Sequence, residues 1–196
     1  MILYIALIAF ADICIIAFNA VCNPLGLSVR TILIAALILP FALIAIDGLA
    51  ATVVRWCLPA KWFDYSSRFQ AVSKRECRIY ELLGVKLWKD RVVELGMFTK
   101  FSKKSVENPE DRAYIERFIL ECNYGALCHL AGIAGGYFLI FCYPPSFAPY
   151  FVIPAATVNA VLSFLPFMIL RYNLPRLHRI RAILEKREAL HAKRDS

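Results

Sequence analysis

The chain has 196 residues, of which 60% are apolar and only 19% are Asp, Glu, Lys or Arg. Soluble domains average about half apolar and about a quarter charged residues. Together with a mean hydropathy of +0.57, this composition excludes a soluble enzyme of ordinary type, a disordered chain and a disulfide-stapled secreted domain. The sequence therefore predicts an integral membrane protein of the all-α class, with residues 1–196 forming a single membrane domain.

Four apolar stretches, taken in chain order, are long enough for helices that cross a bilayer, which needs about 20 residues. A signal peptide needs a basic n-region, and no Lys or Arg precedes the first stretch, so we expect this stretch to remain as a span. The four predicted transmembrane helices cover residues 1–21, 31–54, 122–143 and 150–170.

Basic residues gather on one side of the predicted spans. Of the 23 Lys and Arg residues, 14 lie in residues 55–118 and eight lie in the tail 171–196. The loop 22–30 contains only Arg30, and the loop 144–149 contains no basic residue. Because loops rich in Lys and Arg stay in the cytoplasm, both termini and segment 55–118 are expected to be cytoplasmic.

Segment 55–118 and the tail have compositions typical of polypeptide at a membrane surface. Aromatic residues such as Trp56, Trp62 and Tyr65 lie among basic residues in segment 55–118, whose net charge is +5. The tail has apolar residues at roughly helical spacing between arginines. Both patterns predict interfacial amphipathic helices that contact anionic membrane lipids. The neighbouring spans argue against nucleic acid as a partner, and partner binding by the tail is the alternative to a topology anchor.

The seven cysteines give no sign of a metal site, because no two form a Cys-x-x-Cys pair and no two histidines have zinc-ligand spacing. Most thiols fall in or beside apolar stretches, where cysteine behaves as a small apolar residue. The alternative is a nucleophilic role for Cys122 or Cys128. The chain also lacks the glycine-rich, nucleophile-elbow and zinc-protease motifs of common nucleotide-binding and hydrolytic enzymes.

Ionisable residues inside the predicted spans point most directly to a functional site, because lipid strongly disfavours them. They are Asp12, Asp47 and His129, with Glu121 at the boundary. A rise of about 1.5 Å per residue places Asp47 and His129 roughly 10–12 Å from the cytoplasmic edge, a similar depth at which the two could meet across a helix interface. A neutral His held by a carboxylate is a competent general base. The alternative is a polar contact that serves helix packing.

Glu121 and the end of the fourth span complete this candidate site. Glu121 lies eight residues from His129, too far for a direct bond, and is expected to order the cytoplasmic rim or to pair with an arginine there. Asn173 before Leu-Pro is expected to end the fourth helix, so that Arg171 and Arg176 face the same rim. Arginine suits phosphate or carboxylate binding, and the alternative is simple positive-inside anchoring.

Three blocks of the sequence resemble one family. The runs 115–129 and 165–177 are similar to the glycosyl-4,4'-diaponeurosporenoate acyltransferase family, which comprises small bacterial membrane enzymes of staphyloxanthin-type carotenoid biosynthesis. Residues 87–91, followed by Gly96, resemble a third block of that family. The most specific piece is Arg-Tyr-Asn-Leu-Pro-Arg at 171–176, and the resemblance extends over about 60–190.

The resemblance implies transfer of a fatty acyl group to a hydroxyl of a glycosylated isoprenoid or carotenoid-type lipid in the bacterial cell membrane. It implies acyl-CoA or another acyl thioester as the donor substrate and a glycolipid as the acceptor, with no cofactor. His129 is then the candidate base that deprotonates the acceptor hydroxyl, Asp47 orients it, and Glu121 is the third catalytic candidate. The candidates for holding the donor phosphates and polarising its carbonyl are Arg171, Asn173, Arg176, Lys89 and Arg91.

The chain departs from the family pattern within the block that ends at His129. The family block reads Glu-Thr-x-x-Ala-Glu-x-x-His, whereas here Cys122 replaces Thr, Gly125 replaces Ala and Ala126 replaces the second Glu. A Glu one turn before His129 could orient the imidazole, so its loss either passes that role to Asp47 or removes the activity. The alternative function is a non-enzymatic membrane scaffold or lipid-binding module. The sequence leaves the acceptor, the acyl chain and the oligomeric state open.

Overall fold

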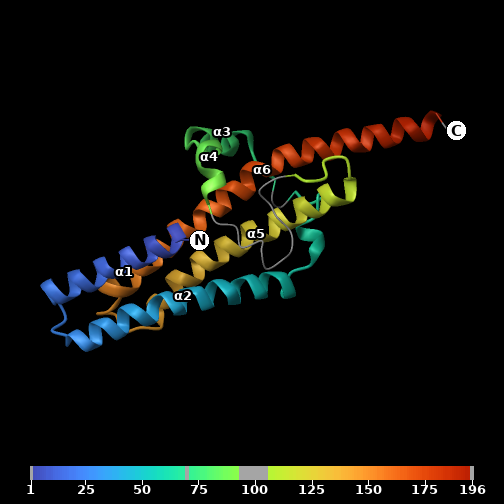
Figure 1. Ribbon diagram of the computed structural model, residues 1–196. Coiled ribbons are helices and arrows are strands. Elements are labelled where there is room, and N and C mark those ends of the chain that lie inside the picture. The colour runs from blue at the N-terminus through green and yellow to red at the C-terminus, as the bar shows by residue number, and fades with distance from the viewer. Residues whose placement is uncertain (1, 69–70, 93–105, 195–196) are drawn as a thin grey trace. The chain divides into compact units, whose positions relative to one another are not determined.

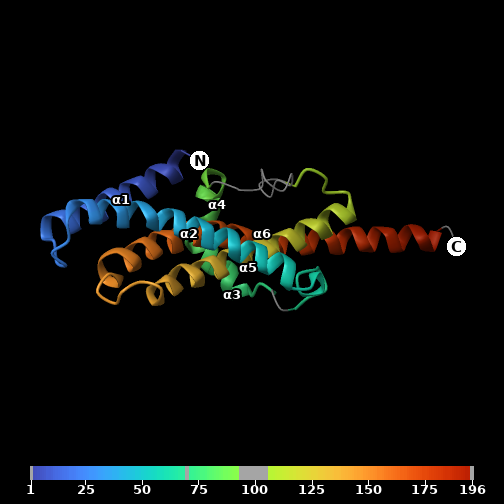
Figure 2. The same ribbon diagram turned by 90° about the horizontal axis from the view of Figure 1, so that it is seen from below.

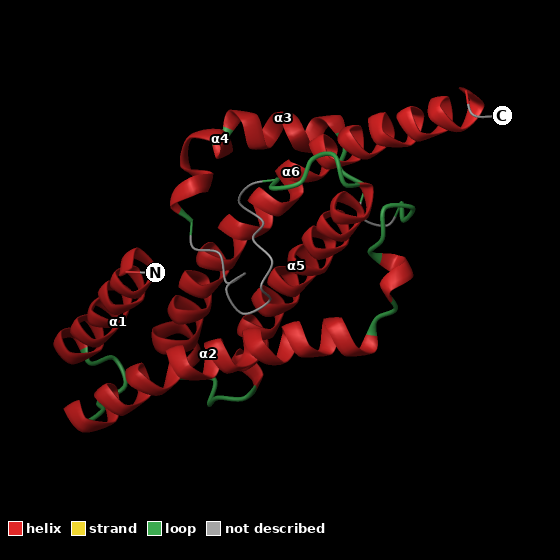
Figure 3. Cartoon of the chain, turned by 45° about the vertical axis from the view of Figure 1, so that its right-hand side comes forward, coloured by secondary structure: helices red, strands yellow, loops and turns green. Residues whose placement is uncertain are grey.

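The computed structural model describes residues 2–68, 71–92 and 106–194, with side chains from residue 4 onward. Within these three ranges the regular structure is entirely helical, which confirms the predicted all-α class (Figures 1 and 3). Four helices are long: α1 Ile2–Cys22, α2 Val29–Cys57, α5 Arg112–Phe138 and α6 Ile153–Arg194. The shorter elements are η1 Ala60–Trp62, α3 Lys74–Leu82, α4 Val85–Trp88, η2 Lys89–Arg91, η4 Leu139–Phe141 and the π-helical turn η5 Ala148–Val152.

The four long helices coincide with the four predicted spans, and each is long and apolar enough to cross a membrane. The third begins earlier than predicted, at Arg112 rather than near residue 122. Asp111 causes this early start, because its carboxylate accepts a hydrogen bond of 3.1 Å from the backbone N–H of Tyr114 at the helix N-terminus. The extra turns are amphipathic, and their charged side chains form ion pairs that the apolar pattern alone does not predict.

The prediction that the fourth helix ends at Asn173 is wrong. Helix α6 continues through Pro166 and Pro175 as far as Arg194, so the predicted tail helix and the fourth span are one element. Proline removes one backbone hydrogen bond but is tolerated where packing compensates. Leu174 and Leu177, on either side of Pro175, are almost completely buried in a cluster with residues of α5, which holds the helix together across the proline.

The described chain divides into two compact units, and long helices contribute to both. The first unit comprises Met1–Val54 and Cys128–Leu165. The second unit comprises Arg55–Leu127 and Pro166–Ser196. The first contains α1 and most of α2, whereas the second contains the short elements between α2 and α5. Each unit has its own buried core.

In the first unit, glycines on α5 allow α2 to approach closely. A Cβ atom built on Gly132 would collide with the Asp47 carboxylate, and one on Gly135 would lie 2.6 Å from the Cγ2 atom of Ile46. Small residues permit such close backbone contact between helices within a membrane. Helices α2 and α5 run alongside each other in both views (Figures 1 and 2). The glycines thus set the packing that brings Asp47 against α5.

The core of the second unit is formed by one face of α5 and one face of α6. Its fully buried members from α5 include Ile115, Phe118 and Ile119, which contact Leu174 and its neighbours on α6. Around this core, Arg181 pairs with Glu116 at 2.9 Å and stacks over the ring of Tyr65 at 3.5 Å from its centroid. Ion pairs between charged side chains therefore connect α5 and α6 outside their apolar core.

Candidate functional site

The short helices α3 and α4 form a hairpin that positions several charged side chains of the second unit. Ser73 caps α3, because its hydroxyl accepts a hydrogen bond of 3.1 Å from the backbone N–H of Glu76. The chain reverses at Gly84, whose φ of +63° lies in the left-handed region that favours glycine. The indole of Trp88 then donates to the carbonyl of Leu83 at 3.0 Å and fixes the reversal.

Arg171 binds this hairpin to α6 through a paired contact with Glu76. Its Nε and Nη2 atoms each donate to a different carboxylate oxygen of Glu76 at 2.7 Å, and the Tyr80 hydroxyl donates to the same carboxylate at 2.6 Å. Burial alone would raise the pKa of Glu76, but the hydrogen bonds from Arg171 and Tyr80 outweigh it and lower the pKa below its ordinary value. Burial and the nearby carboxylate raise the pKa of Tyr80. Glu76 is therefore an ionised anchor for Arg171.

A cavity of about 380 Å³ opens beside this ion pair, between the α3–α4 hairpin and the middle of α6. It brings together three of the predicted binding residues, Lys89, Asn173 and Arg176. Lys86 and Arg179 add two more cations, and Glu81 is the only carboxylate among the lining residues. The other lining residues are Cys77, Tyr172 and Pro175. With four cations against one carboxylate, the cavity suits an anionic ligand that carries phosphate groups.

Sequence reasoning missed Arg179 and Tyr172 because it ended the fourth helix too early. On a continuous helix, Tyr172, Arg176 and Arg179 follow each other at spacings of four and three residues and therefore share a face. The i, i+4 spacing of Cys77 and Glu81 likewise places both on one side of α3. Lys86 had no such signal, because its position depends on the reversal at Gly84.

Cys77 lies in the cavity, but its environment does not activate the thiol. Burial, followed by the negative charges of Glu76 and Glu81, raises the pKa of Cys77 above its ordinary value. A thiol with a raised pKa stays protonated near neutral pH and is a poor nucleophile. Cys77 therefore serves as part of the cavity wall.

Two predicted binding residues lie outside the cavity lining. Arg171 contacts Glu76, as described above, and also donates to the carbonyl of Ala71 at 3.4 Å. Arg91 is exposed at the end of η2 and is not among the lining residues. The structure thus retains Lys89, Asn173 and Arg176 as binding candidates and gives Arg171 a contact within the protein.

Glu121 pairs with Arg55, which is one of the two roles predicted for it. The Arg55 Nη2 atom lies 2.6 Å from the carboxylate, and its guanidinium lies 5.4 Å from the ring centre of Tyr124. Tyr124 in turn stacks on Phe63 with 4.1 Å between ring centroids. The Asn123 amide donates to the carbonyl of Phe63 at 2.7 Å. Glu121 therefore takes part in a group of polar and aromatic contacts that connects the end of α2 to α5.

Asp47 and His129 lie in the first unit. The Asp47 carboxylate accepts a hydrogen bond of 3.3 Å from the amide of Asn159 on α6, a partner that the sequence analysis did not identify. Gly132 packs directly against the same carboxylate. His129 is half-buried and precedes Gly132 by three residues, so the two positions lie on neighbouring parts of the same face of α5. The pairing of Asp47 with His129 stays a prediction.

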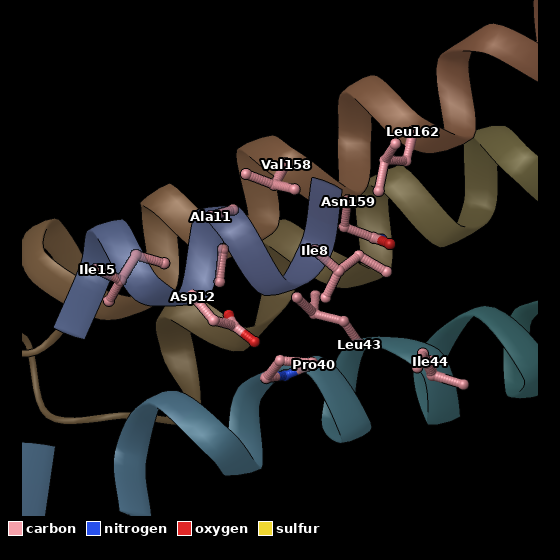
Figure 4. Close-up of a pocket in the computed structure, with 11 residues that line it drawn as sticks. Ile8, Ala11, Asp12, Ile15, Pro40, Leu43, Ile44, Val158, Asn159 and Leu162 are labelled. Atoms are coloured by element: carbon pink, nitrogen blue, oxygen red, sulfur yellow. The ribbon is translucent and has the colours of Figure 1, made fainter. Parts of the chain in front are cut away.

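Asn159 also lines a small pocket in the first unit, together with Asp12 (Figure 4). Residues of α1, α2 and α6 surround this pocket, and apart from these two polar side chains its walls are apolar. Asn159 thus lines the pocket that Asp12 also lines, and its amide donates to Asp47. Both carboxylates that the sequence places inside the spans, Asp12 and Asp47, therefore lie in the first unit.

Packing explains two of the three departures from the block, those at Cys122 and Ala126. Cys122 and Ala126 are fully buried in the apolar cluster of the second unit, against Leu170 and Leu174 of α6. A glutamate at position 126 would place a carboxylate in that cluster, at a cost in desolvation unless a partner were present. Ala126 instead completes the apolar contact. Across the described parts of the chain, no group of three or more His, Cys, Asp or Glu residues is arranged to hold a metal ion.

Comparison with known proteins gives one match. A search of curated proteins and a search of solved structures each find no similar protein. The family model for glycosyl-4,4'-diaponeurosporenoate acyltransferase matches residues 59–183, which is well over half of the chain. The matched residues include the whole lining of the basic cavity and His129, but not Asp12 or Asp47. The chain therefore belongs to the glycosyl-4,4'-diaponeurosporenoate acyltransferase family, whose members act in carotenoid-type glycolipid modification.

Proposed function

We propose that this protein is a membrane acyltransferase that moves a fatty acyl group from a thioester donor to a hydroxyl of a glycosylated isoprenoid or carotenoid-type lipid. The acceptor oxygen forms the new ester bond, the carbon–sulfur bond of the donor breaks, and the thiol leaves. The proton passes from the hydroxyl to a base and then to the departing sulfur. No other reactant is needed for this balance.

The observation that carries the proposal is the basic cavity of the second unit. Acyl-CoA, the proposed donor, carries several phosphate groups, and the cavity presents Lys86, Lys89, Arg176 and Arg179 toward one space. Charge-assisted hydrogen bonds from arginine to phosphate are among the strongest that a protein makes. The amide of Asn173 adds a neutral donor and acceptor that can orient the bound group.

His129 is the proposed general base, and Asp47 is the proposed positioning residue. In this account a neutral imidazole accepts the proton of the acceptor hydroxyl as the oxygen attacks the thioester carbonyl. Asn159 holds the Asp47 carboxylate, so that Asp47 can orient a neighbouring polar group without itself taking the proton. The role proposed for Glu121 is to order the polar end of α5 through its ion pair with Arg55.

The proposed location is the plasma membrane of a bacterial cell, with both termini and the short helices between α2 and α5 on the cytoplasmic side. The distribution of Lys and Arg along the chain supports this orientation. It would expose the basic cavity to the compartment that supplies acyl-CoA. In a variant whose seven native cysteines are replaced, single cysteines are introduced within residues 60–92. Labelling of these cysteines by an impermeant thiol probe in intact cells would overturn the orientation.

The alternative function is a lipid-binding scaffold without catalysis. Two observations favour it, because Arg171 and Glu121 both make ion pairs within the protein. Under this alternative His129 would serve packing alone, and the basic cavity would bind lipid phosphates without turnover.

A comparison of lipid extracts separates the two functions. Mass spectrometry of cells with and without the gene should show an acylated glycolipid that is lost in the deletion strain and replaced by a species lighter by one acyl group. Complementation with the parent gene should restore it, and complementation with the His129→Gln variant should not. An unchanged lipid profile in the deletion strain would contradict the enzymatic proposal and favour the scaffold.

A further inference from the structure

The α3–α4 hairpin exposes large aliphatic side chains on the side that faces away from the cavity. Ile79 is 53% exposed, Leu82 81%, Leu83 52% and Leu87 84%. These four residues form what we name the outer face of the hairpin. Soluble surfaces rarely present so many large aliphatic side chains together, and such patches mark contact with a membrane or another protein.

Neither the length of the hairpin nor its own packing accounts for this exposure. Helices α3 and α4 have nine and four residues, which is far too short to cross a bilayer. The opposite side of α3 is already occupied, because Glu76 binds Arg171, Tyr80 is buried and Cys77 lines the cavity. The hairpin cannot turn its outer face inward without breaking these contacts.

Basic residues lie next to the outer face. Lys74, Arg75 and Arg78 are all exposed, and the helical spacing places Arg75 and Arg78 on the same side of α3 as Ile79 and Leu82. An amphipathic helix with leucines on one face and cations beside them is typical of polypeptide that lies in the surface of an anionic bilayer. Positive charge complements the anionic phospholipids of a membrane surface and does not favour an apolar protein partner.

We propose that the outer face of the hairpin inserts into the headgroup layer of an anionic lipid bilayer, with Leu82 and Leu87 as the most deeply inserted side chains. The four long helices already bring the chain to a membrane, so this surface needs no separate recruitment. Insertion would hold the opposite side of the hairpin, with its basic cavity, at the lipid surface. A ligand with a phosphate head and an acyl tail could then place its head in the cavity while its tail remains in lipid. The insertion itself does not depend on the proposed enzymatic activity.

The direct test is photocrosslinking of the purified full chain in vesicles of phosphatidylcholine and phosphatidylglycerol. Benzoylphenylalanine is introduced separately at Leu82, at Leu87 and, as a matched control, at the exposed polar residue Glu110 of the same unit. Mass spectrometry of the irradiated chain identifies the molecule that is attached. We expect phospholipid adducts from Leu82 and Leu87, at a yield well above that from Glu110.

Each other outcome overturns the proposal. An adduct with a second copy of the chain would identify the outer face as a self-association surface. The absence of any adduct, or lipid yields equal to that of Glu110, would mean that the leucines do not enter the bilayer. Replacing Arg75 and Arg78 by Gln should lower the lipid adduct yield at Leu82 by roughly fivefold per charge, because each cation contributes about that factor near an anionic surface. An unchanged yield would contradict the proposal, because the cations beside the outer face would then not contribute to contact with an anionic bilayer.

Discussion

The two units of the chain use polar residues in different ways. In the first unit they are few and lie among apolar helices, where Asn159 holds Asp47 and glycines bring α2 and α5 into contact. In the second unit ion pairs are frequent, and Glu76, Glu116 and Glu121 each bind an arginine. The family match covers the whole cavity of the second unit but omits α1 and α2. Under the proposed function, the basic cavity of the second unit would bind the charged part of the ligand, and His129 of the first unit would accept the proton.

The change expected to have the largest effect removes the proposed base from the first unit. His129→Gln preserves the approximate size and hydrogen bonding of the side chain but cannot accept the proton. Ester formation should fall by about 10²–10⁴-fold, the usual contribution of general-base catalysis. Transfer of a labelled acyl group per folded molecule is the measurement, with the thermal unfolding midpoint as a check on folding.

The control for this change is His191→Gln, which alters an exposed histidine near the end of α6 and should leave the rate unchanged. Asp47→Asn should cause a smaller loss than His129→Gln, because Asp47 is proposed to orient the imidazole. Unchanged specific activity in His129→Gln would remove the catalytic assignment, and a lower unfolding midpoint alone would assign the residue to packing.

The packing of the first unit can be tested at its glycines. Gly132→Leu places a side chain where the Asp47 carboxylate lies and should destabilise the protein by up to about 3 kcal/mol, the usual limit for overpacking. Gly48→Leu on α2 is the matched control, because a Cβ atom there meets nothing within 4 Å. Thermal unfolding in detergent should show a large decrease for Gly132→Leu and little change for Gly48→Leu. Equal decreases would mean that close approach at Gly132 does not determine the packing.

The anchor of the second unit is tested by Glu76→Gln. Loss of the carboxylate breaks the two-point contact with Arg171 and should lower the free energy of unfolding by about 1.5–3 kcal/mol, as expected for hydrogen bonds to a charged group. Glu81→Gln removes a carboxylate of the same helix that is exposed and should have little effect on stability. The free energy of unfolding of both variants is measured by chemical unfolding in one detergent. Equal decreases for Glu76→Gln and Glu81→Gln would show that Glu76 does not anchor Arg171.

A smaller effect should appear in the pH dependence of stability. The hydrogen bonds from Arg171 and Tyr80, opposed by burial, place the folded-state pKa of Glu76 below its ordinary value of 4.5. Its stabilising contribution is therefore complete above that ordinary value and is lost as the pH falls through the lowered folded-state pKa. The difference in unfolding midpoint between the parent and Glu76→Gln should shrink over this acidic range. A difference that stays constant down to pH 3 would contradict the assignment.

Composition and hydropathy were sufficient to predict the helical class and the four long helices, because a helix that crosses lipid must be apolar over about 20 residues. The end of the fourth helix was not predictable from local signals. Asn-Leu-Pro normally favours termination, but burial of Leu174 and Leu177 against α5 outweighs the loss caused by Pro175. Tertiary packing of this kind is invisible in a short window of sequence.

Only part of the candidate site was predictable, because tertiary packing also decides which side chains face the cavity. Lys89, Asn173 and Arg176 were identified from sequence blocks, and the structure brings them into one cavity. Arg179 was missed because its position on the cavity side depends on a helix that continues past Pro175. The contact of Arg171 with Glu76 joins residues 95 positions apart, and no local pattern distinguishes such a pair from a cation that is available for a ligand.

Donor binding by the basic cavity is the central claim of this account, and steady-state kinetics with acyl-CoA test it most directly. The double variant Arg176→Gln, Arg179→Gln should raise the KM for acyl-CoA by roughly tenfold or more, because each arginine contributes a charge-assisted contact to phosphate. The double variant Lys186→Gln, Arg187→Gln removes the same charge from exposed positions of α6 outside the cavity lining and should leave KM unchanged. The same KM for both double variants and the parent would show that the cavity does not hold the donor.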